Sequence, residues 1–234
     1  MNQVIMSSMK EMPNWDKHLD SLERTGNNRQ ARLLATLSAA IARCDNKLTG
    51  QVLSFLKRLE ISREAVYETI LQSYLFLGFP RMIEAALAFS EVFGETNRGR
   101  EIEKISVAEA DKWFRDGMKL CRRVYGRHFE SLKVKFTSIL PEIFRWMVIE
   151  GYGKVLTRPG LTQVERELAE VAALIVDRQE RQLMSHVWGS LNVGAEIALV
   201  RQINADIRPI AGEEAFNLAE DIIHRIQVKY EAAE

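Results

Sequence analysis

The chain has 234 residues, 47% of them hydrophobic, so it can bury a sizeable core as one large domain or two small fused ones. Thirty-two Lys and Arg residues balance 32 Asp and Glu residues. The formal net charge of zero argues against a nucleic-acid partner or attraction to an anionic membrane, so local arginines must hold any anionic ligand. The longest apolar runs, such as YLFLGF from Tyr74, are far shorter than the ~18 residues needed to span a bilayer.

The N-terminus and the cysteines predict a cytoplasmic protein. The start, MNQVIMSSMKEMPNW, lacks the basic residues and the continuous apolar run of a signal peptide. Cys44 and Cys121 form neither a CxxC pair nor a metal-ligand cluster. We therefore expect a soluble protein in a reducing compartment.

Few glycines and prolines, together with the absence of period-two alternation, predict an all-α fold. Residues 1–28 predict an N-terminal arm, with a short helix from about 14 to 24. The next helix is marked by a stripe of apolar residues, Leu33, Leu34, Leu37, Ala40 and Ile41. We expect Asp45 and Ser62 to cap the two helices that follow, Gly78 to end the third, and Pro80 to begin another.

We predict a linker at residues 96–105, because the surrounding segment GETNRGREIEK is polar and holds two glycines. Beyond it, capping boxes are predicted at Ser106-x-x-Glu109, Thr162-x-x-Glu165 and Asp177-x-x-Glu180. Between the first two, Pro141 begins a helix and GYGKVLTRPG interrupts the helical pattern. A later helix is expected to end near residue 206, before RPIAG, and the last helix covers about 213–230.

The sequence also predicts an internal repeat. ARLLATLSAAIARCDNKLTGQVLSFL overlays RELAEVAALIVDRQERQLMSHVWGSL, which predicts a first copy at 29–95, a second at 106–210, and a C-terminal helix and tail at 211–234. Two unrelated amphipathic hairpins would give a similar pattern. In this overlay Glu167 falls opposite Arg32 and His186 opposite Gln51, so only the second copy keeps an acid and an imidazole.

Glu167 and His186 are expected to face each other. Glu167 lies ten residues before the corner at Asp177 and His186 nine after it, so on antiparallel helices they reach nearly the same height. A carboxylate beside an imidazole in a partly dry cleft is a natural proton-transfer pair. The alternative is a structural histidine that a nearby carboxylate holds, locking two helices together.

Three segments resemble the carboxymuconolactone decarboxylase family: GYGKVLTRPGLTQVERELAEVAAL, QLMSHVWGSLNVGA and ETILQSYLFLGFPRMIEA. This family belongs to the all-helical superfamily of alkyl hydroperoxidase D. The resemblance implies two tandem helical repeats with about ten to twelve helices, the first with a degenerate site. It also implies a homo-oligomer, either a trimer that acts as a pseudo-hexamer or a dimer.

In the hydroperoxidase branch, a glutamate precedes CxxC and a histidine follows it. The glutamate matches Glu167 and the histidine His186, but the cysteine positions fall on Gln179 and Gln182. Without those thiols no disulfide step is possible there. Cys44 falls on the first cysteine position of the other copy, where we expect it to be a small buried residue.

The decarboxylase branch lacks CxxC and keeps the histidine. The resemblance implies a lyase that removes carbon dioxide from a small carboxylated lactone, without metal or organic cofactor. His186 is then the proton donor and Glu167 its orienter. Arg158 would bind a substrate carboxylate, and Tyr152 and Trp188 would wall the pocket. A solvated arginine and two core aromatics are the alternatives.

Three hypotheses therefore remain open. The first is a cofactor-free lyase or proton-transfer enzyme acting on a small carboxylated ring or lactone. The second is a hydroperoxidase-like redox protein, which Gln179 and Gln182 disfavour. The third is a non-catalytic helical binding module in which Glu167 and His186 have a structural role.

Overall fold

A computed structural model describes residues 15–23, 28–95 and 104–232 of the chain. The predicted all-α class is confirmed, with no strand among these residues. The elements are α1 Trp15–Glu23, α2 Arg29–Arg43, α3 Asn46–Arg58, α4 Arg63–Gln72, α5 Tyr74–Phe93, α6 Val107–Tyr125, the 3-10 turn η1 Gly126–His128, α7 Phe129–Ile139, α8 Pro141–Trp146, the π-helix η2 Met147–Val155, α9 Gln163–Val176, α10 Glu180–Val193, α11 Ile197–Ala211 and α12 Glu213–Glu231.

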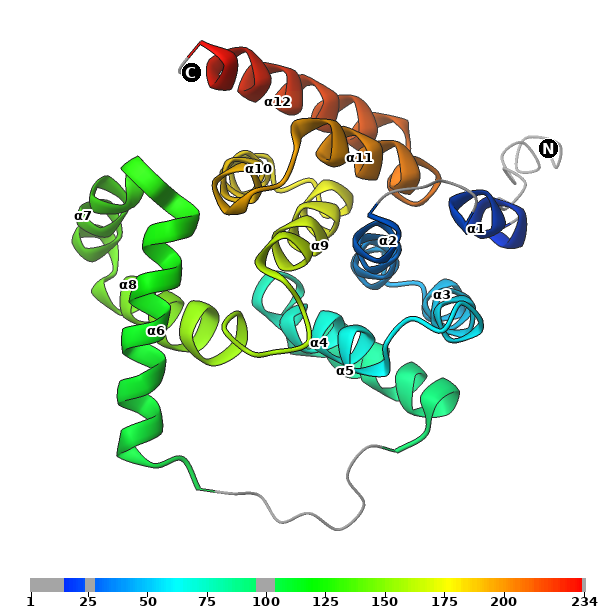
Figure 1. Ribbon diagram of the computed structural model, residues 1–234, viewed down its shortest axis with the longest axis horizontal. Coiled ribbons are helices and arrows are strands. Elements are labelled where there is room, and N and C mark those ends of the chain that lie inside the picture. Colours follow the sequence, from blue (N-terminus) through cyan, green and yellow to red (C-terminus); the bar gives the residue numbers. More distant parts are fainter. Residues whose placement is uncertain (1–14, 24–27, 96–103, 233–234) are drawn as a thin grey trace, which may run out of the picture.

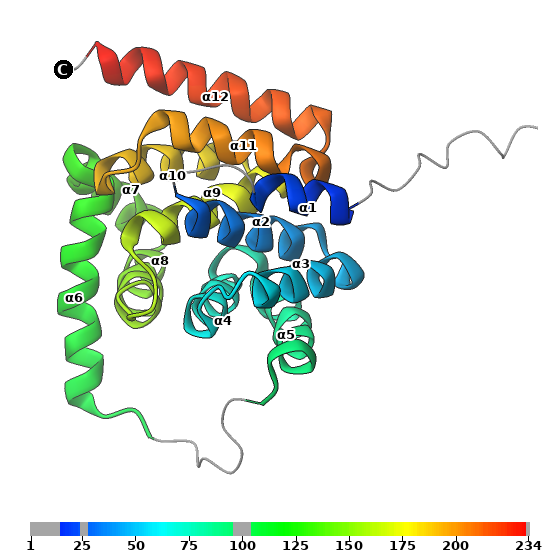
Figure 2. The same ribbon diagram turned by 45° about the vertical axis from the view of Figure 1, so that its right-hand side comes forward.

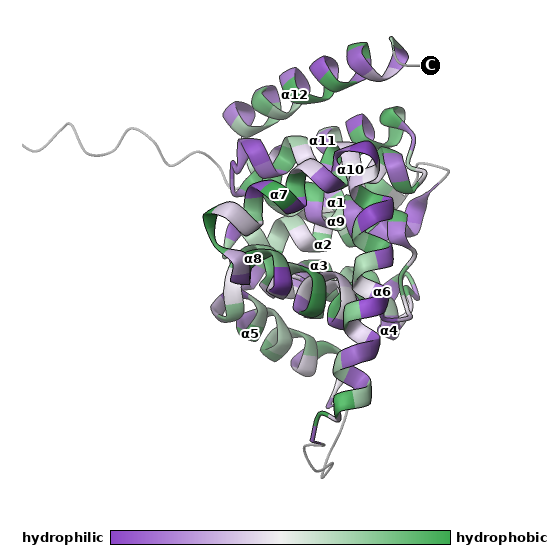
Figure 3. Ribbon diagram, turned by 90° about the vertical axis from the view of Figure 1, so that its left-hand side faces the viewer, coloured by the Kyte–Doolittle hydropathy of each residue, from purple (hydrophilic) through white to green (hydrophobic). Residues whose placement is uncertain are grey.

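Helices α2 and α9 lie side by side at the centre of the molecule (Figures 1 and 2). Helices α3, α4 and α5 pack on one side of this pair, and α10, α11 and α12 on the other. Together with α1 they form the main hydrophobic core. Elements α6 to η2 form a second, smaller core beside α10. Hydrophobic and hydrophilic residues alternate around α6 and α12 (Figure 3), as in helices that bury one face. No helix in the described ranges is both long and apolar enough to cross a membrane.

Most of the predicted helix starts are confirmed. Asp45 accepts a hydrogen bond from the Leu48 amide at 3.0 Å and caps α3, and Ser62 caps α4. Both residues of each of the capping boxes at Ser106 and Thr162 form their reciprocal bonds. These contacts are local, so short sequence motifs predict them well.

The third predicted capping box is wrong. Asp177 ends α9, Arg178 takes a left-handed φ of 54°, and Gln179 is the N-cap of α10. The Asp177 carboxylate instead binds Arg81 of α5, with 2.8 Å between Nη1 and Oδ1. The ion pair with Arg81, which is distant in sequence, therefore engages the Asp177 side chain that local spacing predicted to cap α10.

Two predicted helix breaks are also wrong. Most of GYGKVL continues as the π-helix η2, and α11 runs through Pro209 to Ala211. Gly117 of α6 and Gly153 of η2 explain the first case. A Cβ atom on Gly153 would lie well inside contact distance of the Trp113 carbonyl, and one on Gly117 would overlap the Val148 carbonyl. These glycines let two helices cross closely; they do not end one.

The described part of the predicted N-terminal arm is packed against the main core. Leu19 and Leu22 of α1 are buried in it, and His18 Nε2 lies 2.8 Å from the Asp206 carbonyl. Residues 1–14, and 96–103 of the predicted linker, lie outside the described ranges.

The two hairpins α2–α3 and α9–α10 begin 134 residues apart, at 29 and 163 and again at 46 and 180. In this register Arg32 corresponds to Arg166, so the predicted overlay is shifted by one residue. Both arginines are buried, and each reaches the opposite half. Arg32 Nε binds Asp206 at 2.6 Å, and Arg166 Nη1 binds Gln72, the residue corresponding to Asp206, at 2.9 Å. The two contacts mirror each other in this register, and the division into two copies stays a prediction.

We predict that Gly153→Ala lowers the free energy of unfolding by about 3 kcal/mol, because the new methyl group must push two helix backbones apart. Gly151→Ala is a matched control on the same π-helix, since no heavy atom lies within 4 Å of its added Cβ. It should be neutral or stabilise by about 0.5 kcal/mol. Urea denaturation of both variants checks this, and equal stabilities would contradict the close crossing.

Candidate active site

Glu167 and His186 meet, as their equal distances from the helix corner predict. Oε2 of Glu167 lies 3.0 Å from Nδ1 of His186, and the two residues are only 2% and 5% exposed. The contact joins α9 to α10 in the interior. Because Nδ1 is engaged by the carboxylate, the opposite edge of the ring with Nε2 remains available to the cavity described below.

A second carboxylate, which the sequence interpretation missed, shares this nitrogen. Oε2 of Glu170 also lies 3.0 Å from Nδ1, and the residue is 1% exposed. Neither Glu170 oxygen has hydrogen-bond geometry to a partner in the described part of the chain. Nδ1 bears at most one hydrogen and can donate fully to only one carboxylate. The available signal was spacing, because Glu170 is three residues after Glu167 and so lies on the same helix face.

The three groups shift one another's protonation. Burial by itself lowers the pKa of His186, but the Glu167 and Glu170 carboxylates outweigh it, so that pKa is raised well above its usual value. Burial and the neighbouring charge of Glu167 raise the pKa of Glu170 from 4.5 to about 7. At neutral pH the site thus holds an imidazolium, and Glu170 is poised to gain or lose a proton.

Gly189 provides room for the pair. A Cβ atom at this position would lie 2.7 Å from Oε2 of Glu167 and 2.8 Å from Cγ1 of Val124. Any larger residue would therefore displace the carboxylate or the facing helix α6. This glycine is one turn beyond His186 on α10, and its importance depends on packing that the sequence pattern does not reveal.

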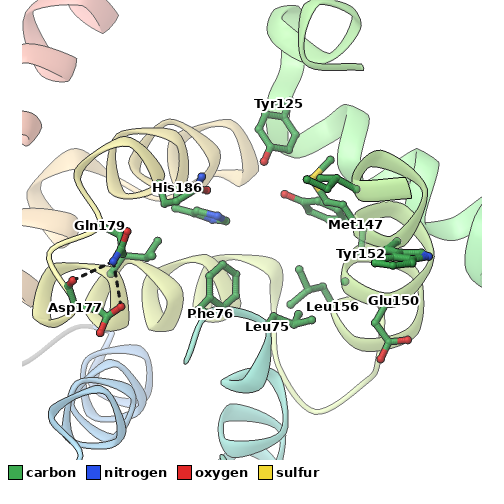
Figure 4. Close-up of a pocket in the computed structure, with 15 residues that line it drawn as sticks. Leu75, Phe76, Tyr125, Met147, Glu150, Tyr152, Leu156, Asp177, Gln179 and His186 are labelled. Atoms are coloured by element: carbon green, nitrogen blue, oxygen red, sulfur yellow. Dashed lines mark hydrogen bonds between the residues drawn. The ribbon is translucent and has the colours of Figure 1, made fainter. Parts of the chain in front are cut away.

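A cavity of about 540 Å³ opens beside His186 (Figure 4). Its wall is mainly apolar and includes Leu75, Phe76, Ile143, Trp146, Met147, Leu156 and Leu174. The Phe76 ring stands edge-on to the imidazole, with 5.1 Å between centroids. Tyr125 and Tyr152 also line the cavity, and their hydroxyls hydrogen-bond to each other. Such a site can exclude water around a reacting ligand.

Of the other predicted site residues, some line the cavity beside His186 and others lie elsewhere. Tyr152 lines the cavity, as do Gln179 and Gln182, which occupy the cysteine positions of the resembled family. Trp188 instead packs near Tyr230 and lines a second cavity of about 400 Å³. Arg158 is absent from the linings of both cavities and forms an ion pair with buried Glu68, with 2.8 Å between Nη2 and Oε1.

Neither cysteine is suited to thiol chemistry at this site. Cys121 of α6 is buried near Glu167, and burial raises the pKa of its thiol from 9.0 to about 12. Cys44 is exposed at the α2–α3 corner with a left-handed φ of 58°, so the expectation that it is buried was wrong. The corner turns its side chain outward from the helix pair.

The trio has a donor set that would suit a divalent cation. Its two carboxylates and imidazole offer ligand atoms within 4.8 Å of one another. However, Glu167 and Glu170 do not line the cavity, so an ion bound there would lie behind the imidazole, away from a ligand in the cavity.

Comparisons with known proteins do not identify the family. No protein-family model matches the chain. One curated protein, Peroxisomal protein 2 of Saccharomyces cerevisiae, is 24% identical over 121 residues. These residues cover 51% of this chain and 42% of the yeast protein, so the match spans less than half of that protein's length.

We predict that Glu170→Gln becomes more stable relative to the wild type as pH rises from 5 to 8. The folded-state pKa of Glu170 is above its ordinary value, so this residue contributes stability at low pH and loses that contribution between pH 4.5 and 7. The relative gain should be about 3 kcal/mol, measured as free energies of unfolding at the two pH values.

Glu130→Gln, on the exposed surface of α7, controls for the loss of one carboxylate. Stability curves for Glu170→Gln and wild type that run parallel from pH 5 to 8 would show that Glu170 does not hold a proton near neutrality.

Proposed function

We propose that this protein is a carboxymuconolactone decarboxylase-like, cofactor-free lyase or proton-transfer enzyme acting on a small carboxylated lactone or ring. The observation that supports it most directly is the buried Glu167–His186 pair at the wall of a largely apolar cavity. The sequence resemblance favours the same chemistry. Glutamines at the two cysteine positions favour it over disulfide-based redox chemistry.

In the proposed reaction His186 is the proton donor and Glu167 the positioning residue. Breaking the bond to the substrate carboxylate releases carbon dioxide and leaves an electron pair delocalised into the unsaturated ring. The Nε2 proton of His186 then adds to a ring carbon, and the neutral imidazole regains a proton from solvent. Glu167 holds the Nδ1 proton throughout and fixes the ring orientation.

The apolar wall contributes by keeping water from the carbanion-like intermediate before the imidazolium protonates it. The Tyr125 and Tyr152 hydroxyls are neutral donors at the wall of the cavity (Figure 4). Arg158 is a weaker candidate for substrate binding, because its guanidinium is already engaged by Glu68.

We also propose self-association, as a trimer or a dimer in the cytoplasm. Phe79, Ile83 and Leu87 are spaced four residues apart on α5 and are each at least half exposed. A stripe of this kind supports burial against another protein surface. A non-catalytic binding module with a structural Glu167–His186 pair is the alternative, and the following experiment separates it from the enzyme.

We predict that His186→Asn lowers kcat for 4-carboxymuconolactone by about 10²–10⁴-fold, the usual contribution of a positioned proton donor. Asparagine can still donate to Glu167, so the oligomer and the unfolding curve should change little. His224→Asn, on the exposed surface of α12, is the matched control. Absence of wild-type turnover on this lactone and related carboxylated rings, with unfolding of His186→Asn, would favour the structural role.

We further predict that a Cys44→Ser, Cys121→Ala double variant keeps wild-type lactone turnover within about threefold, because neither thiol contributes to a proton-transfer reaction. The same preparations should show no thiol-dependent peroxide reduction. A loss of peroxide reduction in the double variant, from a wild type that has this activity, would support the redox hypothesis.

A further inference from the structure

Among the described residues that line the cavity of about 540 Å³, His186 is the only one whose side chain can hold a positive charge near neutral pH. The two carboxylates at the cavity wall have other partners. Glu150 binds the Tyr74 hydroxyl at 2.5 Å and Lys154 at 3.0 Å, and Asp177 binds Arg81 at 2.8 Å. An anionic ligand in this mainly apolar cavity is therefore attracted by one cationic side chain, His186.

The geometry directs that charge into the cavity. Glu167 and Glu170 both approach the Nδ1 side of the imidazole, and the ring projects toward the space between Phe76 and Tyr125 (Figure 4). The remaining nitrogen, Nε2, is on the edge of the ring away from both carboxylates. It can donate a charge-assisted hydrogen bond to a ligand oxygen.

The protonation state of Glu170 controls whether the site attracts or repels an anionic ligand. With Glu167 and Glu170 both ionised around one imidazolium, the trio has a net charge of −1 in a buried place and repels an anion. With Glu170 protonated, the trio is neutral and its positive end faces the cavity. Neither Glu170 oxygen has a hydrogen-bond partner among the described residues, and a proton on Glu170 would turn one of these two oxygens into a hydrogen-bond donor.

We propose that the cavity binds a ligand with one carboxylate or enolate on a small, flat, apolar body, at the His186 imidazolium, together with one proton taken up by Glu170. This inference rests on the proposed function, since it specifies the ligand class of the same site. It assigns to His186 the anion-binding role that the sequence suggested for Arg158.

The surroundings leave Glu170 as the group that takes the proton. Cys121 and Tyr125 of α6 and Tyr152 of η2 also face the site, and burial raises the pKa of each, so they stay neutral around pH 7. Arg166 of α9 remains a cation and is held by Glu68 and Gln72. Among the described groups around the imidazole, Glu170 is the one whose pKa, about 7, lies near neutrality.

Benzoate and its neutral isostere benzamide test this by calorimetry at pH 6, 7 and 8. Wild-type protein should bind benzoate at least tenfold more tightly than benzamide at pH 6. Benzoate affinity should fall by up to about tenfold per unit above pH 7, because one proton is bound with it. Buffers that differ in ionisation enthalpy should report uptake approaching one proton per benzoate at pH 8.

Two variants separate the roles of the residues. Glu170→Gln should bind benzoate with little pH dependence and no proton uptake, and Glu170→Met provides a second replacement of similar length. His186→Asn should lose the preference for benzoate over benzamide. The proposal is overturned if wild type shows no such preference, if Glu170→Gln keeps the wild-type pH slope, or if EDTA abolishes binding, which would place a cation where the proton is proposed.

These outcomes are independent of turnover. Protein that binds benzoate with proton uptake but converts no lactone would contradict the proposed function alone. Protein that converts the lactone but binds benzoate and benzamide equally would contradict this inference alone.

Discussion

Helix α9 is buried on every side, and this constraint organises the centre of the molecule. Ten consecutive residues, 166–175, are shielded from solvent, and three of them are ionisable. A charge that has no access to water must find its partner within the protein. Arg166 finds Glu68 and Gln72 on α4, and Glu167 finds His186 on α10. Glu170 competes for a hydrogen that Glu167 already accepts, and this unequal division gives the site its protonation chemistry.

The neighbouring helix α2 meets the same constraint differently. It too is buried along most of its length, but its ionisable buried residue, Arg32, has a complete partner in Asp206. Threonine stands at position 36, which corresponds to Glu170, and its hydroxyl binds a carbonyl of its own helix. Arg32 of α2 and Asp206 of α11 therefore form a closed ion pair, whereas α9 and α10 hold two carboxylates for one imidazole. Of α2 and α9, only α9 holds a buried carboxylate, Glu170, that has no hydrogen-bond partner among the described residues.

The fold class, most helix bounds and the meeting of Glu167 with His186 could be predicted because they depend on periodicity, caps and equal rise along antiparallel helices. The failures share a physical cause, which is contact with residues distant in sequence. Arg81 removes Asp177 from its predicted cap, and Glu68 occupies Arg158. The Gly117–Gly153 crossing keeps a segment helical that has the composition of a break. Glu170 lies three residues after Glu167, on the same helix face. Its role could not be predicted, because it depends on competition with Glu167 for the single Nδ1 hydrogen of His186 on α10.

The existence of two hydrophobic cores has a consequence for the shape of the cavity. Phe76 and Leu174 belong to the main core, whereas Tyr152 and Leu156 belong to the smaller one, and all four line the same cavity. The cavity thus lies where the two hydrophobic cores meet. The close crossing of Gly117 and Gly153 lies within the elements that form the smaller core. The shape of the ligand space therefore depends on how the two cores pack against each other, so a packing change in either core alters the space beside His186.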